Sequence, residues 1–206
     1  MAPGAETRHR ILREAIHLFA EHGFKATTVA DIEAASGLSP GSGALFAHFP
    51  TKQAVLEAAI EELASLNRQG QSLFDLARLG DLRSELTVFV RAALMGLDGN
   101  RDLVWLWLKE NDRFPQLRPL VEREVNRPAA AWMADYLQAK VKARQLVDHD
   151  AEAVGTIVMG AITAWWIWKQ AAGPDGPSID EDRFVAAWVD LVLRLAPPTP
   201  ARKGRK

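Results

Sequence analysis

The chain has 206 residues, of which 48% are hydrophobic and 25% are charged, a balance typical of a folded, water-soluble protein. Because the sequence contains no cysteine, it excludes disulfide frameworks, thiolate metal sites and cysteine nucleophiles. The formal net charge is −1 at pH 7 and the body is acidic, so nucleic-acid binding would have to use a few placed groups and helix N-termini.

The N-terminus and the most apolar stretch both bear on where the protein acts. The first residues do not combine a basic start with an apolar run, so no secretory signal is expected. The stretch from Ala153 to Trp168 is shorter than the roughly 20 apolar residues that a membrane-spanning helix needs. We therefore expect a buried helix there, no membrane partner and a cytoplasmic location.

Apolar residues recur at helical spacing along almost the whole chain, and no run alternates as a strand would. The pattern predicts an all-α fold of about nine helices. The first helix is expected to begin near Thr7 and end at Gly23, and the second to begin after Thr28 as its N-cap and end at Gly37. A third, short helix is expected after Pro40, which suits a first helical position.

The rest of the chain continues the helical pattern. Thr51 is expected to cap a long helix that reaches the region of Leu73 and Phe74. Further helices are predicted at about 82–97, 101–113, 116–144, 150–172 and 180–195. These elements predict a small N-terminal domain at 1–50, a helical domain at 51–196 and a disordered basic tail at 197–206.

Residues 28–49 form a predicted helix, a short turn and a second helix, the arrangement that places its second helix in the major groove of DNA. Many all-α proteins contain two short helices at a sharp angle, so this geometry alone leaves the function open. The residue types within and around the segment are more specific.

In chain order these residues are TRHRIL (7–12), LFAEHGF (18–24), ATTVADI (26–32), ASGLS (35–39) and ALFAHFPTK (44–52). The series closely resembles the DNA-binding region of the TetR family of bacterial transcriptional regulators. The resemblance implies a homodimeric, ligand-responsive regulator, usually a repressor, with an all-α C-terminal domain for ligand binding and dimerisation. The segment ENDRFPQL (110–117) also looks like one that is common in part of the family.

The joint before the third helix departs from most of the family. It looks two residues longer, at PGSGA (40–44), an extension seen in only some members. Each of its two glycines disfavours a helix by about 1 kcal/mol relative to alanine, so we expect the first turn of the recognition helix to be distorted or partly open. The family commonly has tyrosine where Phe46 stands, and Phe46 lacks the hydroxyl that could reach a phosphate.

The resemblance and the residue chemistry suggest a set of DNA-contacting residues. Lys52 is expected to pair with a phosphate, unless it is an ordinary solvated lysine. Thr28 can bring a hydroxyl to the DNA backbone, although helix capping alone would explain it, and the same holds for Ser39. Ser42, Gly43 and Ala44 are predicted to face base edges. The full set is Thr28, Ser39, Pro40, Ser42, Gly43, Ala44, Phe46, His48 and Lys52, whereas Ile32, Leu38, Leu45 and Phe49 are expected to form the core.

For the C-terminal domain, the resemblance implies a dimer interface in which the helices near 150–172 and 180–195 pack against their copies as a four-helix bundle. Small residues in the first helix permit close approach, and an apolar stripe marks the second. Burial inside a single chain would explain the same stripes. The candidate interface residues are Gly160, Ala161, Ala164, Trp188 and Val192.

All seven tryptophans fall in the C-terminal domain. Ordinary core packing is one explanation, and an apolar pocket with a few polar groups is the other. The predicted pocket residues are Trp105, Trp132, Tyr136 and Trp165, which would suit an apolar or aromatic effector.

Enzyme chemistry has little support in the sequence. The five histidines show no metal-ligand spacing, and neither a glycine-rich phosphate loop after a strand nor a nucleophile elbow is present. We therefore predict a regulator without catalytic residues, metal or cofactor, most simply a repressor that a small effector releases from operator DNA by a population shift. The alternatives are a helical small-molecule-binding protein that has lost DNA binding, and a helical enzyme.

Overall fold

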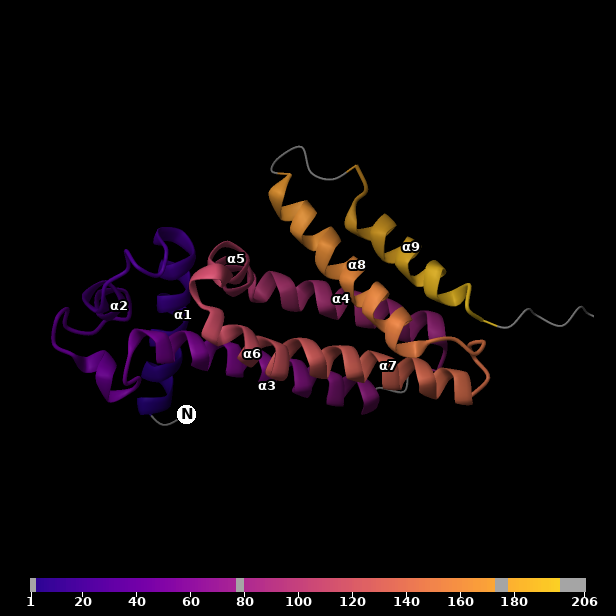
Figure 1. The fold of residues 1–206 in the computed structure, drawn as a ribbon, viewed down its shortest axis with the longest axis horizontal. Helices are drawn as coiled ribbons and strands as arrows, with labels where there is room; N and C mark the ends of the chain where they lie inside the picture. Colours follow the sequence, from indigo (N-terminus) through magenta and orange to yellow (C-terminus); the bar gives the residue numbers. More distant parts are fainter. Residues whose placement is uncertain (1–2, 77–79, 173–177, 197–206) are drawn as a thin grey trace, which may run out of the picture. The chain divides into compact units, whose positions relative to one another are not determined.

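The computed structural model describes residues 3–76, 80–172 and 178–196. Within these residues all regular structure is helical, which confirms the predicted fold class (Figure 1). The α-helices are α1 (Pro3–His22), α2 (Val29–Ala35), α3 (Lys52–Leu76), α4 (Leu82–Gly99), α5 (Arg101–Glu110), α6 (Arg118–Val121), α7 (Arg127–Lys142), α8 (Ala151–Ala171) and α9 (Glu181–Leu193). Three 3-10 segments, η1 (Ala44–Ala47), η2 (Asn111–Arg113) and η3 (Pro115–Leu117), and one π-helical turn, η4 (Glu122–Asn126), complete them.

The helices form two compact units. Unit 1 consists of the chain up to Gly70 together with Asp98–Pro128, and unit 2 consists of Gln71–Leu97 together with the chain from Ala129 on. Unit 1 therefore contains the predicted N-terminal domain and, in addition, the first part of α3 and all of α5 and α6. The domain boundary after residue 50 stays a prediction, and the predicted tail at 197–206 lies outside the described residues.

Local sequence signals explain the ends of the first two helices. Gly23 follows α1 with φ 86°, a left-handed conformation that favours glycine, and its amide donates to the carbonyl of Phe19. Thr28 caps α2 in a capping box, in which its hydroxyl accepts from the Asp31 amide and its own amide donates to the Asp31 carboxylate. Helix α1 begins at Pro3, earlier than the predicted start near Thr7.

The core of unit 1 holds the N-terminal helices together. Ile11 and Phe19 of α1, Ile32 of α2 and Leu45 of η1 are almost completely buried in one cluster. Burying such a side chain contributes roughly 1.5–3 kcal/mol. The predicted core residue Phe49 is buried with them, and Leu38 packs against the cluster while staying partly exposed.

Helix α8 is the most apolar element of unit 2. Among the described residues it is the one helix that is long and apolar enough to cross a membrane, and the core helix of a soluble protein passes the same test. One face of α8, including Val158, Ile162 and Trp166, is buried. Ile157 and Trp168 on the same helix are exposed, so the predicted buried helix is found only in part. The indole of Trp188 on α9 donates to the Val158 carbonyl at 2.8 Å, which joins the two helices within one chain.

Gly155 marks a close approach of α8 to α7 in unit 2. A Cβ there would lie 3.3 Å from Met133 Cγ and 3.4 Å from the Ala134 amide nitrogen. We expect Gly155→Leu to lower the free energy of unfolding by about 1–3 kcal/mol, because the added atoms overfill this contact. Gly96→Leu on α4, where a Cβ meets no atom within 4 Å, is the matched control. Equal stability of the two variants in urea would contradict this packing.

Candidate functional site

The turn after α2 does not continue into a regular recognition helix. Gly41 and Gly43 both have left-handed backbones, with φ 74° and 75°. The Ser42 amide donates to the Ser39 carbonyl at 3.2 Å, and the first helical hydrogen bonds appear only in the four-residue segment η1. The open first turn that the glycines predict is therefore present, because two left-handed residues interrupt the helix.

The DNA-contacting candidates of this turn lie along one continuous, partly exposed stretch of chain. Ser39, Pro40 and Ser42 are exposed, whereas Gly43 and Ala44 are half-buried. Phe46 projects from η1 with 52% of its surface exposed, and His48 follows it half-buried. The structure thus brings seven of the nine candidates together, along a segment without any lysine or arginine.

Thr28 lies at the start of α2, and its hydroxyl is used within the cap. It accepts from the Asp31 amide at 3.1 Å and also donates to the Asp31 carboxylate at 2.7 Å. These hydrogen bonds to Thr28 lower the pKa of Asp31. Helix capping is therefore sufficient to explain Thr28. A contact between Thr28 and DNA stays a prediction.

Lys52 is held inside unit 1 rather than extended into solvent. Its Nζ donates to the backbone carbonyls of Phe24 at 2.5 Å and Thr27 at 2.7 Å. The same nitrogen lies 4.3 Å from the centre of the Phe24 ring. Partial burial lowers the pKa of Lys52, and the negative charge of Glu110 opposes that shift. The lysine thus fastens the loop between α1 and α2 to the start of α3, and its phosphate contact stays a prediction.

Two groups near the turn were not predicted from the sequence. Glu33 of α2 is completely buried, and its carboxylate accepts the amides of Gly41 at 2.8 Å and Leu45 at 3.1 Å. Arg8 of α1 lies with its guanidinium 4.7 Å from the centre of the Phe49 ring. The sequence signal for a buried Glu33 was its position directly after Ile32, an expected core residue, on a short amphipathic helix.

The segment that follows α5 contacts the loop between α1 and α2. The Phe24 amide donates to the Glu110 carboxylate at 3.4 Å. The Phe24 ring meets the edge of the Phe114 ring, with 4.7 Å between ring centres. The ENDRFPQL segment therefore supports the N-terminal helices within unit 1, a role that its sequence alone did not indicate.

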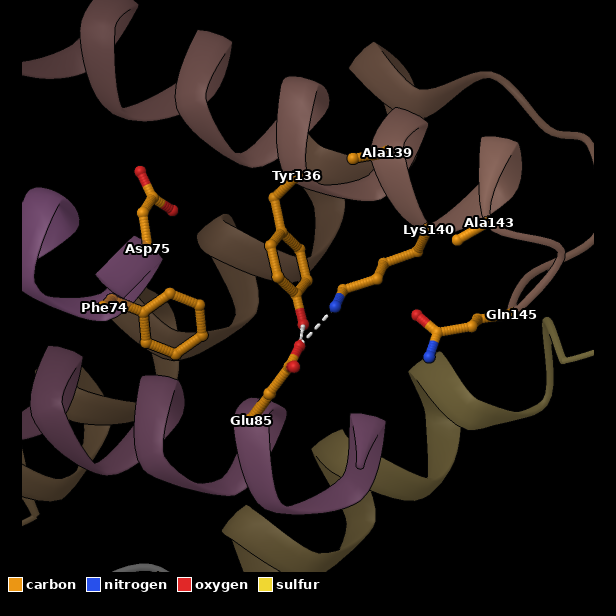
Figure 2. A pocket seen from close by; sticks show the side chains of 8 residues that line it. All are labelled: Phe74, Asp75, Glu85, Tyr136, Ala139, Lys140, Ala143 and Gln145. Atoms are coloured by element: carbon orange, nitrogen blue, oxygen red, sulfur yellow. Dashed lines mark hydrogen bonds and ion pairs between the residues drawn. The ribbon is translucent and has the colours of Figure 1, made fainter. Parts of the chain in front are cut away.

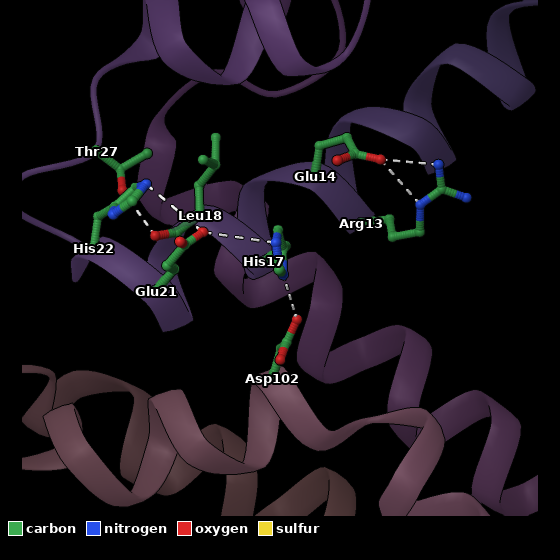
Figure 3. Close-up of polar contacts among 8 residues, drawn as sticks. All are labelled: Arg13, Glu14, His17, Leu18, Glu21, His22, Thr27 and Asp102. Carbon is green, nitrogen blue, oxygen red and sulfur yellow. Dashed lines mark hydrogen bonds and ion pairs between the residues drawn. The ribbon is translucent and has the colours of Figure 1, made fainter.

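A contact between α1 and α5 involves a titratable group, the imidazole of His17 (Figure 3). His17 Nδ1 lies 2.9 Å from the Asp102 carboxylate, and Glu21 lies on the other side of the imidazole ring. The hydrogen bond to Asp102 is the main cause of the raised pKa of His17.

We expect the His17 imidazole to titrate above its ordinary pKa of about 6.5, and Asp102→Asn to return the pKa toward that value. Because the folded-state pKa is raised, the stabilisation from this pair is complete below about pH 6.5 and is lost as the pH rises through the folded-state pKa. NMR titration of the His17 ring measures its pKa in wild type and in Asp102→Asn. A pKa that Asp102→Asn leaves unchanged would contradict the contact.

Unit 2 contains a cavity of about 250 Å³ at the ends of α3, α4 and α7 (Figure 2). At its centre Tyr136 and Lys140 converge on the carboxylate of Glu85, with 2.8 Å from the Tyr136 hydroxyl to Glu85 Oε2. Burial first, and Glu85 second, raise the pKa of the Tyr136 phenol well above its usual range. The lining residues are Phe74, Asp75, Glu85, Tyr136, Ala139, Lys140, Ala143 and Gln145.

The four predicted pocket residues are not all found together. Tyr136 lines the cavity, and Trp132 stacks on it with 5.8 Å between ring centres while its indole donates to Asp75. Trp165 instead stacks on Phe184 at 4.5 Å, away from the lining residues. Trp105 belongs to α5 in unit 1.

The predicted interface residues divide into two groups. Gly160 and Ala164 are exposed on α8, with Ala161 half-buried between them. By contrast, Trp188 is 3% exposed and Val192 is 1% exposed. Their stripe is covered within unit 2 of one chain, because α9 turns that face toward α8 through the contact between Trp188 and Val158.

Known proteins are similar to the part of the chain that contains the DNA-contacting candidates. Residues 11–59 match the family of bacterial regulatory proteins called the tetR family. The HTH-type transcriptional regulator YerO of Bacillus subtilis strain 168, itself uncharacterised, is 33% identical over 108 residues, which are 52% of this chain and 36% of YerO. The chain thus matches about a third of the length of that curated relative.

Solved structures extend the similarity to nearly the whole chain. The TetR-family regulator PfmR of Thermus thermophilus is 25% identical with a TM-score of 0.66, over 90% of this chain and 97% of PfmR. GusR of Salmonella enterica is 24% identical with a TM-score of 0.71, over 95% and 97%. AibR, solved with isovaleryl coenzyme A and operator DNA, is 16% identical with a TM-score of 0.68, over 91% and 98%.

The solved structures show the fold of this chain, which PfmR and GusR share. The family match covers residues 11–59, the segment that contains the DNA-contacting candidates.

Proposed function

We propose that the chain is a ligand-responsive, DNA-binding transcriptional regulator that acts as a homodimer in the cytoplasm, most simply as a repressor. The observation that carries this proposal is the helix-turn-helix of residues 28–49, which lies inside the segment matched to the tetR family. AibR, which shares the fold, is described with both an acyl-coenzyme A ligand and operator DNA.

The proposed DNA surface is formed by the accessible residues of the stretch from Ser39 to His48, which includes the proposed two-residue extension. Ser42 can hydrogen-bond to base edges, while Ala44 and Phe46 offer apolar contact to thymine methyl groups. The sequence has no lysine or arginine between residues 26 and 51, so positive charge for the phosphates must come from flanking groups. Arg8, an exposed residue whose guanidinium lies over the Phe49 ring, is one such group, and Lys52 and the amides at the start of α3 are further candidates.

The proposed dimer interface is the exposed face of α8. Its small residues Gly160, Ala161 and Ala164 recur at helical spacing, and two large exposed side chains flank them, Ile157 at 64% and Trp168 at 67%. An exposed apolar stripe with a small-residue centre suits close packing against the same helix of a second copy. Trp188 and Val192 contribute only from behind this face, by supporting α8.

The proposed effector site is the cavity of unit 2, and the effector is a small apolar or aromatic molecule. Phe74 and Tyr136 supply aromatic surface, whereas Glu85 and Lys140 supply polar groups that can orient the ligand. The effector acts by binding more tightly to a conformation whose two recognition segments do not fit adjacent major grooves. Helix α3 contributes residues both to the lining of this cavity and to unit 1. We propose that it transmits the conformational change from the effector site to the recognition segment.

The test is to sequence the genomic fragments that the purified protein retains at low ionic strength. The proposal predicts a small set of enriched fragments, among them DNA that flanks the protein's own gene. Retention of no fragment, together with tight binding of an aromatic ligand, would favour a small-molecule-binding protein that has lost DNA binding. The internal hydrogen bonds of Lys52 are the observation behind that second candidate.

A helical enzyme is the third candidate, and the family match does not support it. Among the described residues no group of three His, Asp or Glu side chains could hold a metal ion. Turnover of a substrate that survives removal of residues 1–50 would establish it.

A further inference from the structure

We infer that Glu33 is a positioning residue for DNA recognition, whose buried carboxylate clamps both ends of the base-reading segment Ser42–Ala44. The inference rests on the proposed function, since it concerns how the helix-turn-helix presents that segment to DNA. Nothing in the family match or in the predicted contacts assigns a role to Glu33.

The geometry of the clamp is specific. Glu33 Oε2 accepts the amide of Gly41 at 2.8 Å, and Glu33 Oε1 accepts the amide of Leu45 at 3.1 Å. The glutamate is 0% exposed. One carboxylate on α2 therefore fixes the residues immediately before and immediately after Ser42, Gly43 and Ala44, the three residues predicted to face the bases.

The broken helix turn explains why this carboxylate is needed. In a continuous α-helix the Leu45 amide would donate to the carbonyl four residues earlier, at Gly41. The left-handed backbones of Gly41 and Gly43 interrupt that pattern, and the Leu45 amide is directed to Glu33 instead. A buried amide without an acceptor is unfavourable, so Glu33 supplies what the missing turn would have supplied.

The residue type also argues for this role. The neighbouring positions Ile32 and Ser36 are fully buried with Glu33, so an apolar side chain would fit this face of α2 better than a carboxylate. A negative charge behind a DNA-facing segment would also repel phosphates unless it were satisfied. Two charge-assisted hydrogen bonds from backbone amides satisfy it, and they leave the segment between the amides held at both ends.

The experiment compares wild type with Glu33→Gln and Glu33→Ala on an operator fragment and on unrelated DNA. Glutamine can accept one amide, but its NH2 group faces the other, so we expect operator affinity to fall about 10- to 100-fold while affinity for unrelated DNA changes little. Alanine is expected to have a larger effect. Glu61→Gln on α3 removes the same charge from an exposed position and should leave both affinities unchanged.

Three further measurements distinguish a positioning role of Glu33 from a loss of folding. Circular dichroism and sedimentation should show that Glu33→Gln keeps the helical content and oligomeric state of wild type. In wild type, the Gly41 and Leu45 amides should exchange with solvent much more slowly than the Gly43 amide, which lies between them in the open turn.

The outcomes are distinguishable from those of the proposed function. If wild type binds an operator and Glu33→Gln binds it equally well, the inference is wrong although the function holds. If wild type binds no DNA at all, the proposed function fails. The amide exchange of Gly41 and Leu45 still decides whether the carboxylate clamps the segment, and rapid exchange of both amides overturns the inference in any case.

Discussion

Ala164→Glu is expected to convert the proposed dimer into a monomer and to lower operator affinity by more than about 100-fold, because a single copy can engage only one half-site. Ala164 lies at the centre of the exposed α8 stripe, between Ile157 and Trp168. In a two-fold interface, each introduced carboxylate would face its copy and would lose water without gaining a partner.

Sedimentation at micromolar protein concentration measures the first effect, and a gel shift measures the second. Ala92→Glu, at an exposed alanine of α4 in the same unit, is the matched control and should remain dimeric. A wild type that sediments as a monomer, or an Ala164→Glu variant that stays dimeric, would show that α8 does not form the interface.

Glu85→Ala is expected to lower the free energy of unfolding by about 1–3 kcal/mol and to weaken the response to effector. The change removes the acceptor that Tyr136 and Lys140 share, and the Lys140 ammonium in the cavity wall loses the carboxylate with which it pairs. Lys140 and Glu85 are mostly but not completely buried, at 16% and 17% side-chain exposure, so water reduces the effect below that of a fully buried pair. Urea unfolding of Glu85→Ala and Glu85→Gln compares loss of the charge with loss of the whole group.

The Tyr136 phenol offers an independent readout of this cluster, because it is the one tyrosine in the sequence. Absorbance of the tyrosinate should appear well above the ordinary pKa of about 10, and at lower pH in Glu85→Ala than in wild type. Since the folded-state pKa is raised, stability is unaffected below about pH 10 and falls as the pH rises beyond it. Ionisation at the ordinary pKa in wild type would contradict the buried hydrogen bond.

The sequence was sufficient for features that depend on neighbours along the chain. Thr28 is the N-cap of α2 as expected, because an N-cap depends on the residues that directly follow it in the chain. Gly23 ends α1, and the glycines at 41 and 43 open the first turn of the recognition segment, because glycine tolerates a left-handed backbone at both places. The all-α fold followed from apolar periodicity.

Features that depend on contacts between distant segments were not predictable in this way. Glu33 reaches Leu45 across twelve positions, and Lys52 reaches Phe24 across twenty-eight. Local rules place a charged side chain in solvent or against a phosphate. In the folded chain, however, the Glu33 carboxylate and the Lys52 ammonium hydrogen-bond to backbone groups of distant residues. No rule of local spacing shows that such partners will be present.

The aromatic residues show the same limit for the second unit. Periodicity identified apolar stripes but not which element covers each stripe, so Trp188 was predicted in an interface although α8 of the same chain covers it. Composition indicated an aromatic pocket but not which aromatic residues line it. Tyr136 lines the cavity, Trp132 supports it, and Trp165 pairs with Phe184 elsewhere.

Footprinting of the purified protein on its own promoter DNA tests whether the dimer reads an operator. We expect two protected half-sites on one face of the duplex, with centres about 34–36 Å apart, and loss of protection when a bound effector shifts the population. Uniform cleavage of the promoter at every protein concentration, at low ionic strength and without effector, would contradict it.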